Sequence, residues 1–255
     1  VYRIATPTLN YGAGSTNYAI TLQAMLNYSR SFAHAHHLSA LVLYNQNSKS
    51  ATGAKDYNFI PENFRGYTAR IGYDFQNRYL FEISGAYNGS DRFAQERRFG
   101  FFPAASIGWN IAEEKFVKQK LPFIDIFKLR GSYGLTGVDN TGGVYAYLQN
   151  YSIGSGSGLF GEANNNSYVT AAEGALGNNQ VTWEKEKKMD IGLDLAFLNR
   201  KLTATIDYFD NNRFDILTSR GAVSAVFGQT LPNVNLGKTN NKGWEVELGY
   251  TGQIQ

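Results

Sequence analysis

The sequence predicts an all-β protein, with about nine strands of a larger antiparallel up-and-down transmembrane β-barrel. Three observations support this fold class: apolar and polar residues alternate over strand-length segments, the links alternate between short and long, and charged residues occupy the middle of the polar stripes. The composition agrees, because 27 Gly and 15% aromatic residues accompany only 18% charged residues, below the roughly 25% of an average soluble domain.

The strands are predicted from a period of two residues. Between Tyr18 and Ser29 every even position is apolar, whereas the odd positions include Thr21, Gln23 and Asn27. Such alternation gives a strand one apolar and one polar face. The same pattern recurs in eight further segments, at Leu38–Tyr44, Tyr67–Phe75, Tyr79–Tyr87, Ala105–Ile111, Phe127–Leu135, Met189–Phe197, Leu202–Tyr208 and Trp244–Tyr250.

The links between these segments alternate strictly in length. The shorter ones are Ser31–His37, Gln76–Arg78, Ala112–Asp125 and Leu198–Arg200, and the longer ones are 45–66, 88–102, 137–185 and 210–243. Membrane β-barrels show this alternation, with short periplasmic turns and long extracellular loops. We therefore expect the four longer links to be extracellular loops. A helix-like stretch at Ile111–Leu121 should cap a strand end within a shorter link.

The polar stripes carry charges in mid-strand, which suits a wet barrel lumen. We expect the following residues to face that lumen: Arg70, Asp74, Glu82, Lys128, Arg130, Asp190 and Asp194, with Asp207, Glu245 and Glu247 beyond them. Tyr and Phe near both ends of the apolar stripes resemble the two aromatic girdles of a membrane barrel. A large soluble sandwich would bury the same apolar stripes, and periodicity alone leaves that alternative open.

Several classes of protein are excluded or disfavoured. The longest clean apolar run is Ala40–Tyr44, far short of the roughly 18 residues of a membrane helix. The net charge of +3 comes from scattered Lys and Arg, so no nucleic-acid partner is expected. There is no Cys for disulfides or thiolate chemistry. The segment from Gly154 to Gly158 lacks the Lys-Ser/Thr of a phosphate loop, and no cofactor is expected.

The three histidines are His34, His36 and His37, all in one shorter link. Alternate positions could present two metal ligands on one side of an extended segment. No Cys or carboxylate lies nearby in the sequence, so a solvated polar turn is the preferred interpretation and no metal is predicted. Because all the histidines cluster here and no nucleophile is marked, we expect no enzyme activity.

The stretch from Gly137 to Gln180 is polar, Gly-rich and aromatic. Its four tyrosines are candidates to bind a sugar or peptide by stacking, and they are Tyr145, Tyr147, Tyr151 and Tyr168. A loop that simply packs on its neighbours explains these tyrosines equally well.

Five motifs in order resemble the barrel of SusC/RagA-type TonB-dependent outer-membrane transporters. Asn88–Phe93 resembles the family's D-G-S-S-R-F loop, followed by Phe102–Trp109, and Lys128–Gly137 resembles its L-K-L-R-x-S-x-G-x-T-G strand. The remaining matches are Trp183-Glu184, Asp190–Asp194 with Asp207–Phe209, and Asn241–Glu245. The chain departs from the family where Asn178-Asn179 replaces Asn-Pro and where Asp91 replaces a common Ser.

The resemblance implies a 22-stranded barrel with a plug, in the outer membrane of a Gram-negative bacterium. It also implies a SusD-type surface lipoprotein lid and import of oligosaccharides or peptides driven through TonB. Residues 1–255 are expected to form part of the barrel wall and its loops, without plug or signal peptide, so that other strands complete the barrel. The rival functions are a soluble or surface-attached carbohydrate-binding β-sandwich and a passive porin.

Overall fold

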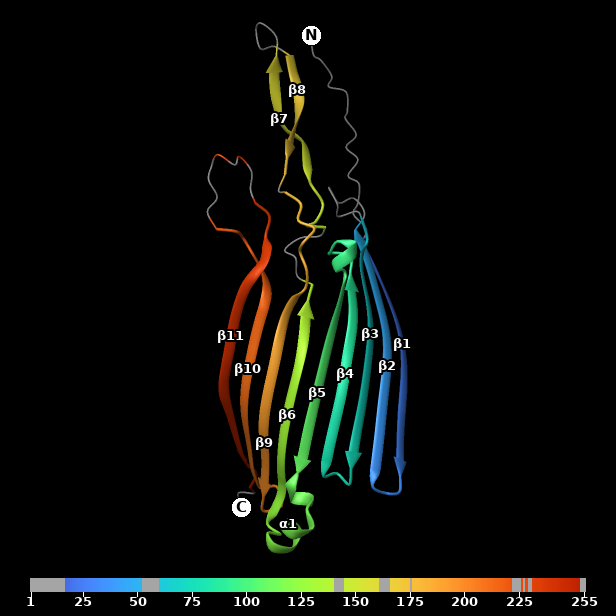
Figure 1. The fold of residues 1–255 in the computed structure, drawn as a ribbon, viewed down its shortest axis with the longest axis vertical. Coiled ribbons are helices and arrows are strands. Elements are labelled where there is room, and N and C mark those ends of the chain that lie inside the picture. Colours follow the sequence, from blue (N-terminus) through green and yellow to red (C-terminus); the bar gives the residue numbers. More distant parts are fainter. Residues whose placement is uncertain are drawn as a thin grey trace, which may run out of the picture.

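The computed structural model describes residues 17–51, 60–139, 145–160, 166–174, 176–221, 226, 228 and 231–252. Nine long strands form one antiparallel sheet in which neighbours in sequence are neighbours in space (Figure 1). They are β1 (Asn17–Phe32), β2 (His36–Ala51), β3 (Glu62–Phe75), β4 (Tyr79–Ser90), β5 (Phe99–Asn110), β6 (Ile124–Val138), β9 (Glu184–Phe197), β10 (Leu202–Thr218) and β11 (Val234–Tyr250). The predicted up-and-down topology and nine-strand sheet are confirmed, and the sheet is open, with β1 and β11 at its edges.

All nine apolar stripes lie on one face of this sheet. Residues directly opposite each other in an antiparallel pair point to the same side, and Leu26 is opposite Val42, while Ile206 lies between Leu193 and Val246. These side chains are open to the surroundings, with Leu26 72% and Val246 63% exposed. A soluble sandwich would cover this face with a second sheet. No such sheet exists in the described part of the chain.

The strands are longer, and the long links shorter, than the sequence pattern predicted. Pairing continues through Ala51 at the end of β2 and Thr218 at the end of β10, inside the expected loops 45–66 and 210–243. The expected loop 137–185 contains an unpredicted hairpin of β7 (Tyr151–Phe160) and β8 (Asn166–Glu173). Beyond the apolar band both faces of a strand can be polar, so the strands continue there without a period-two signal.

The shorter links lie together at the end opposite the β7–β8 hairpin (Figure 1). Three of them turn tightly through consecutive residues with left-handed backbone, Ala33–His34, Gln76–Asn77 and Leu198–Arg200, at φ from 50° to 60°. The predicted helical stretch is present as the 3-10 turn η3 (Ile111–Glu113) and the short helix α1 (Lys115–Lys120). No helix of the described residues is both long and apolar enough to cross a membrane.

The main buried core sits at the loop end of the sheet. It consists of Phe93, Phe102, Val181 and Trp183. Phe93 is 1% exposed, and its ring centroid lies 5.2 Å from that of Trp183. The Trp183 indole also donates to the carbonyl of Arg98 at 3.1 Å. Two links far apart in sequence are therefore fastened to each other at the rim of the wall.

Candidate functional site on the inner wall and at the loop base

The polar face of the sheet carries a charge cluster centred on Arg130 of β6. Its guanidinium contacts Asp190 of β9 at 2.9 Å, Asp194 of β9 at 3.3 Å and Asp207 of β10 at 2.6 Å. These side chains are between 17% and 35% exposed, so the cluster is shielded in part from solvent. Three carboxylates around one guanidinium leave the group with an excess of negative charge.

Gly192 makes this cluster possible. It lies opposite Arg130 on one side and Asp207 on the other in the strand register. A Cβ at Gly192 would lie 2.3 Å from Oδ1 of Asp207 and 2.4 Å from Cζ of Arg130. Arg130 therefore crosses β9 through space that only a glycine leaves open. The glycine of the Asp190–Asp194 motif thus serves a side-chain network rather than a turn.

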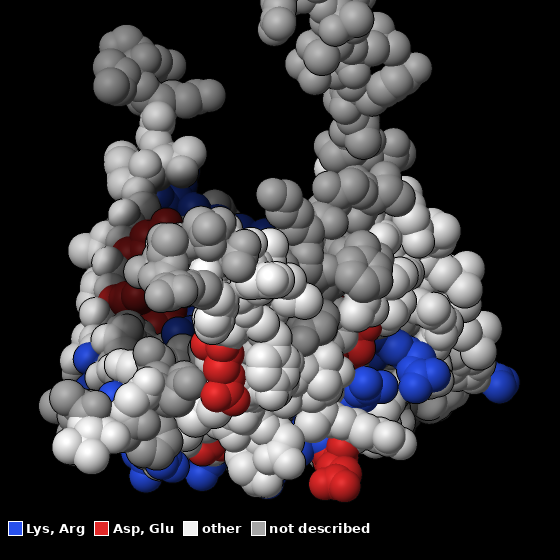
Figure 2. Space-filling model, turned by 90° about the horizontal axis from the view of Figure 1, so that it is seen from above, with Lys and Arg blue, Asp and Glu red and all other residues white. Residues whose placement is uncertain are grey.

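A cavity of about 390 Å³ indents the same polar face. Its lining includes five of the charged residues that the sequence analysis assigned to a lumen, namely Asp74, Glu82, Lys128, Arg130 and Asp190. Of the remaining two, Arg70 lies 3.9 Å from Glu82 and Asp194 contacts Arg130. The seven residues thus share one face of the wall. Figure 2 shows the molecule from above, where both acidic and basic side chains are visible at the loop end.

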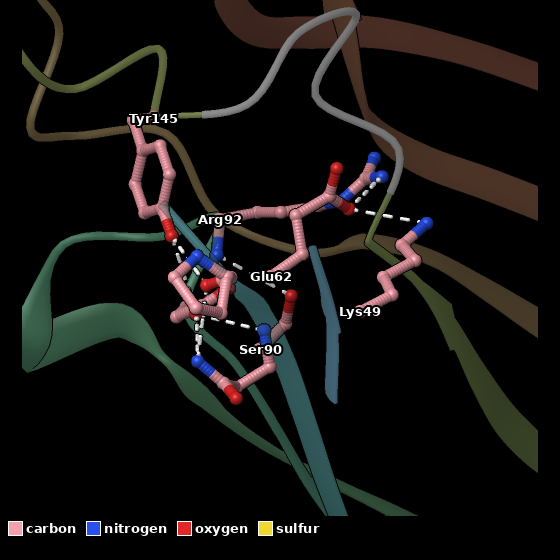
Figure 3. A network of polar contacts seen from close by, with 8 residues as sticks. Lys49, Glu62, Ser90, Arg92 and Tyr145 are labelled. Atoms are coloured by element: carbon pink, nitrogen blue, oxygen red, sulfur yellow. Dashed lines mark hydrogen bonds and ion pairs between the residues drawn. The ribbon is translucent and has the colours of Figure 1, made fainter. Parts of the chain in front are cut away.

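A second polar network ties the long links to the rim (Figure 3). Glu62 at the start of β3 contacts Lys49 of β2 at 3.2 Å and Arg92 at 2.8 Å. Asp91 accepts hydrogen bonds from the backbone amide and side-chain amide of Asn63, at 2.8 and 2.9 Å. The segment after β4 is thus bound to the preceding strands by both charge and backbone contacts.

Tyr145 is an anchor at the base of the longest link. It is 6% exposed, and its hydroxyl donates to the carbonyl of Pro61 at 2.8 Å (Figure 3). Burial, with a smaller contribution from the nearby Asp91 carboxylate, raises the pKa of Tyr145 to about 12. The phenol therefore remains a neutral donor at physiological pH. Tyr147 meets it edge to face at a centroid distance of 6.0 Å.

The other two candidate tyrosines lie out on the β7–β8 hairpin. Tyr151 and Tyr168 are each 60% exposed. Tyr151 is opposite Glu173 and Tyr168 is opposite Gly158, so the alternation of side chains along β8 places them on opposite faces of the hairpin. The four tyrosines therefore do not converge on one surface. Tyr145 and Tyr147 lie at the base of the link, and Tyr151 and Tyr168 project from the β7–β8 hairpin.

His36 and His37 contact different neighbouring side chains. His36 Nδ1 lies 2.7 Å from the hydroxyl of Tyr73, and His37 Nδ1 lies 2.6 Å from Oγ of Ser31. Adjacent residues of a strand point to opposite faces, so these two rings diverge. Over the described ranges no three His, Asp or Glu side chains gather in a way that could hold a metal ion.

Sequence reasoning missed the packing role of its own motifs. Phe93 of the Asn88–Phe93 motif and Trp183 of the Trp-Glu motif form the rim core. Gly137 ends the Lys128–Gly137 motif, and a Cβ there would lie 2.1 Å from the ring of Phe102. The signal was the presence of Phe93 and Trp183 as isolated aromatic residues in polar links. Period-two patterns cannot detect such residues, because their partners are distant in sequence.

Comparison with known proteins places this architecture in a family. The family model described as TonB dependent receptor-like, beta-barrel matches residues 2–253. The chain is 34% identical over 185 residues to the TonB-dependent receptor SusC of Bacteroides thetaiotaomicron, covering 71% of this chain and 18% of SusC. It is 31% identical over 221 residues to the TonB-dependent receptor P39 of Formosa agariphila, covering 83% of this chain and 20% of that protein.

A solved structure with the same fold is the RagAB peptide importer in its closed-closed state. The TM-score is 0.76 at 18% identity, covering 94% of this chain and 28% of that chain. The described chain thus spans about a fifth of the length of the curated relatives it matches. The family model covers nearly all of these residues, and the nine-stranded sheet has the expected topology. The chain belongs to the TonB-dependent receptor β-barrel family, as a SusC/RagA-type barrel segment.

Proposed function

We propose that this chain forms part of an outer-membrane active transporter that imports oligosaccharides or peptides into a Gram-negative bacterium, with energy supplied through TonB. The observation that carries the proposal is the continuous exposed apolar face of a nine-stranded up-and-down sheet. Such a face is stable in lipid, where the antiparallel strands satisfy one another's backbone groups. The charged opposite face then lines a wet lumen.

The substrate class follows from the relatives rather than from a site in this chain. The RagAB structure is named a peptide importer, and the SusC/RagA resemblance adds oligosaccharides. The exposed Tyr151 and Tyr168 offer stacking faces for either class. The buried Tyr145 contributes instead by holding the base of the link that carries them.

The proposal includes partners for the open sheet. Edge strands β1 and β11 each present a row of backbone donors and acceptors that lipid cannot satisfy. Further strands, from the rest of the protein or from other chains, must pair with both edges. A SusD-like lipoprotein lid would meet the links at the hairpin end, which we assign to the cell exterior.

Uptake by the full-length protein tests the transport proposal. Cells with and without the gene should be compared for uptake of panels of fluorescently labelled oligosaccharides and labelled peptides, and the comparison repeated after TonB is inactivated. We expect one panel to enter only when both the gene and TonB are intact. Uptake that requires the gene but persists without TonB would identify a passive porin. Equal uptake with and without the gene would refute the transport proposal.

Orientation has its own test, with a matched pair of single cysteines. Ser157 lies on the hairpin and Asn199 lies in the turn between β9 and β10. An impermeant thiol reagent applied to intact cells should label a cysteine at Ser157 and spare one at Asn199. Labelling at Asn199 alone would reverse the assigned orientation.

A further inference from the structure

The link between β5 and β6 is fastened to the apolar face of the sheet, at its turn end. Glu114 accepts hydrogen bonds from the hydroxyl of Tyr79 at 2.9 Å and from the indole of Trp109 at 3.2 Å. Tyr79 and Trp109 are opposite each other in the register and belong to the apolar stripes. Arg78 adds an ion pair to Glu114 at 3.6 Å. The link is thereby held on the side of the wall that faces lipid.

The helix in this link buries little and exposes apolar side chains. Among the described residues of η3 and α1, the only ones buried are Ala112 and Val117. Phe116 is 57% exposed, and Phe123 and Leu121, beyond the helix, are 50% and 40% exposed. A short segment with protruding Phe and Leu beside lysines is typical of helices that lie in the membrane interface.

Lysines flank these apolar side chains. Lys118 is paired with Glu113, and Glu114 is engaged by Arg78, which leaves Lys115 and Lys120 without an ion pair within the described residues. Both are exposed at the turn end of the wall. Their charge is therefore available to a partner that carries anions.

The neighbouring turn between β9 and β10 extends the same surface. The amide of Leu198 donates to the carbonyl of Phe123 at 3.0 Å, and the amide of Arg200 donates to Asp125 at 2.8 Å. Leu198 is itself 57% exposed, and Lys201 follows Arg200 in the turn. Figure 1 shows α1 at the bottom of the sheet, beside the ends of β6 and β9.

We propose that the link 111–123 and the turn 198–201 form a phospholipid-binding surface that lies in the headgroup layer of the turn-side leaflet. Phe116, Leu121 and Phe123 enter the boundary of the acyl chains, and Lys115 and Lys120 meet lipid phosphates. The surface continues the lipid-facing stripes of the barrel wall, which is the reason to choose lipid over a protein partner. This inference rests on the proposed membrane barrel.

Spin-label accessibility in the full-length protein tests the depth of α1. Single cysteines at Phe116, Leu193 and Ser157 would carry nitroxide labels in vesicles of phosphatidylethanolamine and phosphatidylglycerol, and the access of oxygen and of a water-soluble nickel chelate would be compared. We expect the labels at Phe116 and at mid-stripe Leu193 to be more accessible to oxygen, and the label at Ser157 to be more accessible to the nickel chelate. If Phe116 behaves like Ser157 while Leu193 stays in lipid, the inference is wrong and the barrel proposal survives. If Leu193 also favours nickel, the membrane barrel itself is refuted.

The contribution of the two lysines to phospholipid binding can be measured separately. Spin-labelled phosphatidylglycerol and phosphatidylcholine would be compared for association with the wild-type protein and with Lys115→Gln/Lys120→Gln. Each lysine near an anionic surface should contribute about fivefold in affinity, so the double variant should lose most of the preference for phosphatidylglycerol. Lys238→Gln, at an exposed position of β11 toward the opposite end of the wall, is the matched control and should retain it. An unchanged preference in the double variant would overturn the phosphate contacts.

Discussion

Replacing Gly192 with alanine should separate Arg130 from Asp207 and weaken the barrel wall. The new methyl carbon would lie 2.3 Å from an Asp207 oxygen and 2.4 Å from the Arg130 guanidinium carbon, well inside van der Waals contact. Arg130 would have to leave its path across β9. Asp207 would then face Glu245, directly opposite on β11, without its cation, and like charges at opposite positions destabilise a sheet.

The size of the effect follows from the exposure of the cluster. Partly exposed ion pairs are worth about 0.5 to 1 kcal/mol each, and Arg130 makes three of them. We therefore expect the free energy of unfolding to fall by about 1.5 to 3 kcal/mol. Gly131→Ala is the matched control, because a Cβ there meets its nearest neighbours at 3.9 and 4.0 Å. That substitution should be neutral or slightly stabilising.

Urea unfolding of the full-length protein in phospholipid vesicles, followed by Trp fluorescence, measures this difference. In an Arg130→Gln background the cost of Gly192→Ala should shrink, because the cluster is already broken. Equal costs for Gly192→Ala and Gly131→Ala, or an unchanged cost in the Arg130→Gln background, would show that the close contact with Arg130 does not matter.

Four further substitutions test other parts of the structure. Leu193→Arg on the apolar face should cost roughly 2–4 kcal/mol of stability, measured in the same unfolding assay, whereas Thr205→Arg on the polar face should cost little; the opposite ranking would invert the two faces. Tyr145→Phe should remove about 1 kcal/mol of local stability and speed proteolysis of the 139–183 link without changing barrel unfolding, and unchanged cleavage would argue against the anchor. Gly137→Val should displace the Phe102 ring and expose Trp183 to solvent. The emission maximum of tryptophan fluorescence should then shift to the red, and an unaltered spectrum would contradict the packing described.

The wall of the barrel was predictable because lipid imposes a strict rule on it. One face must be apolar, so residues such as Ile71 and Leu193 mark the strands at every second position. Outside the apolar band this rule no longer applies, and the pattern missed the outer ends of the strands and the β7–β8 hairpin.

The candidate site was only partly predictable, for a different reason. The polar face could be named from charges in mid-strand, but the convergence of Asp190, Asp194 and Asp207 on Arg130 depends on register across three strands. Tyr145 was identified as a residue of interest, yet nothing in its local sequence indicates that its hydroxyl meets Pro61, 84 positions away. Contacts between distant segments require the fold itself.

The core at the loop end of the wall also holds the base of the β7–β8 hairpin. Trp183 packs on Phe93, and Tyr145 donates to Pro61, so both ends of the link that carries the β7–β8 hairpin are attached to the rim. If a ligand or partner binds at Tyr151 or Tyr168, it would have fewer chain conformations to suppress, so the rim core would favour binding by reducing that entropy loss.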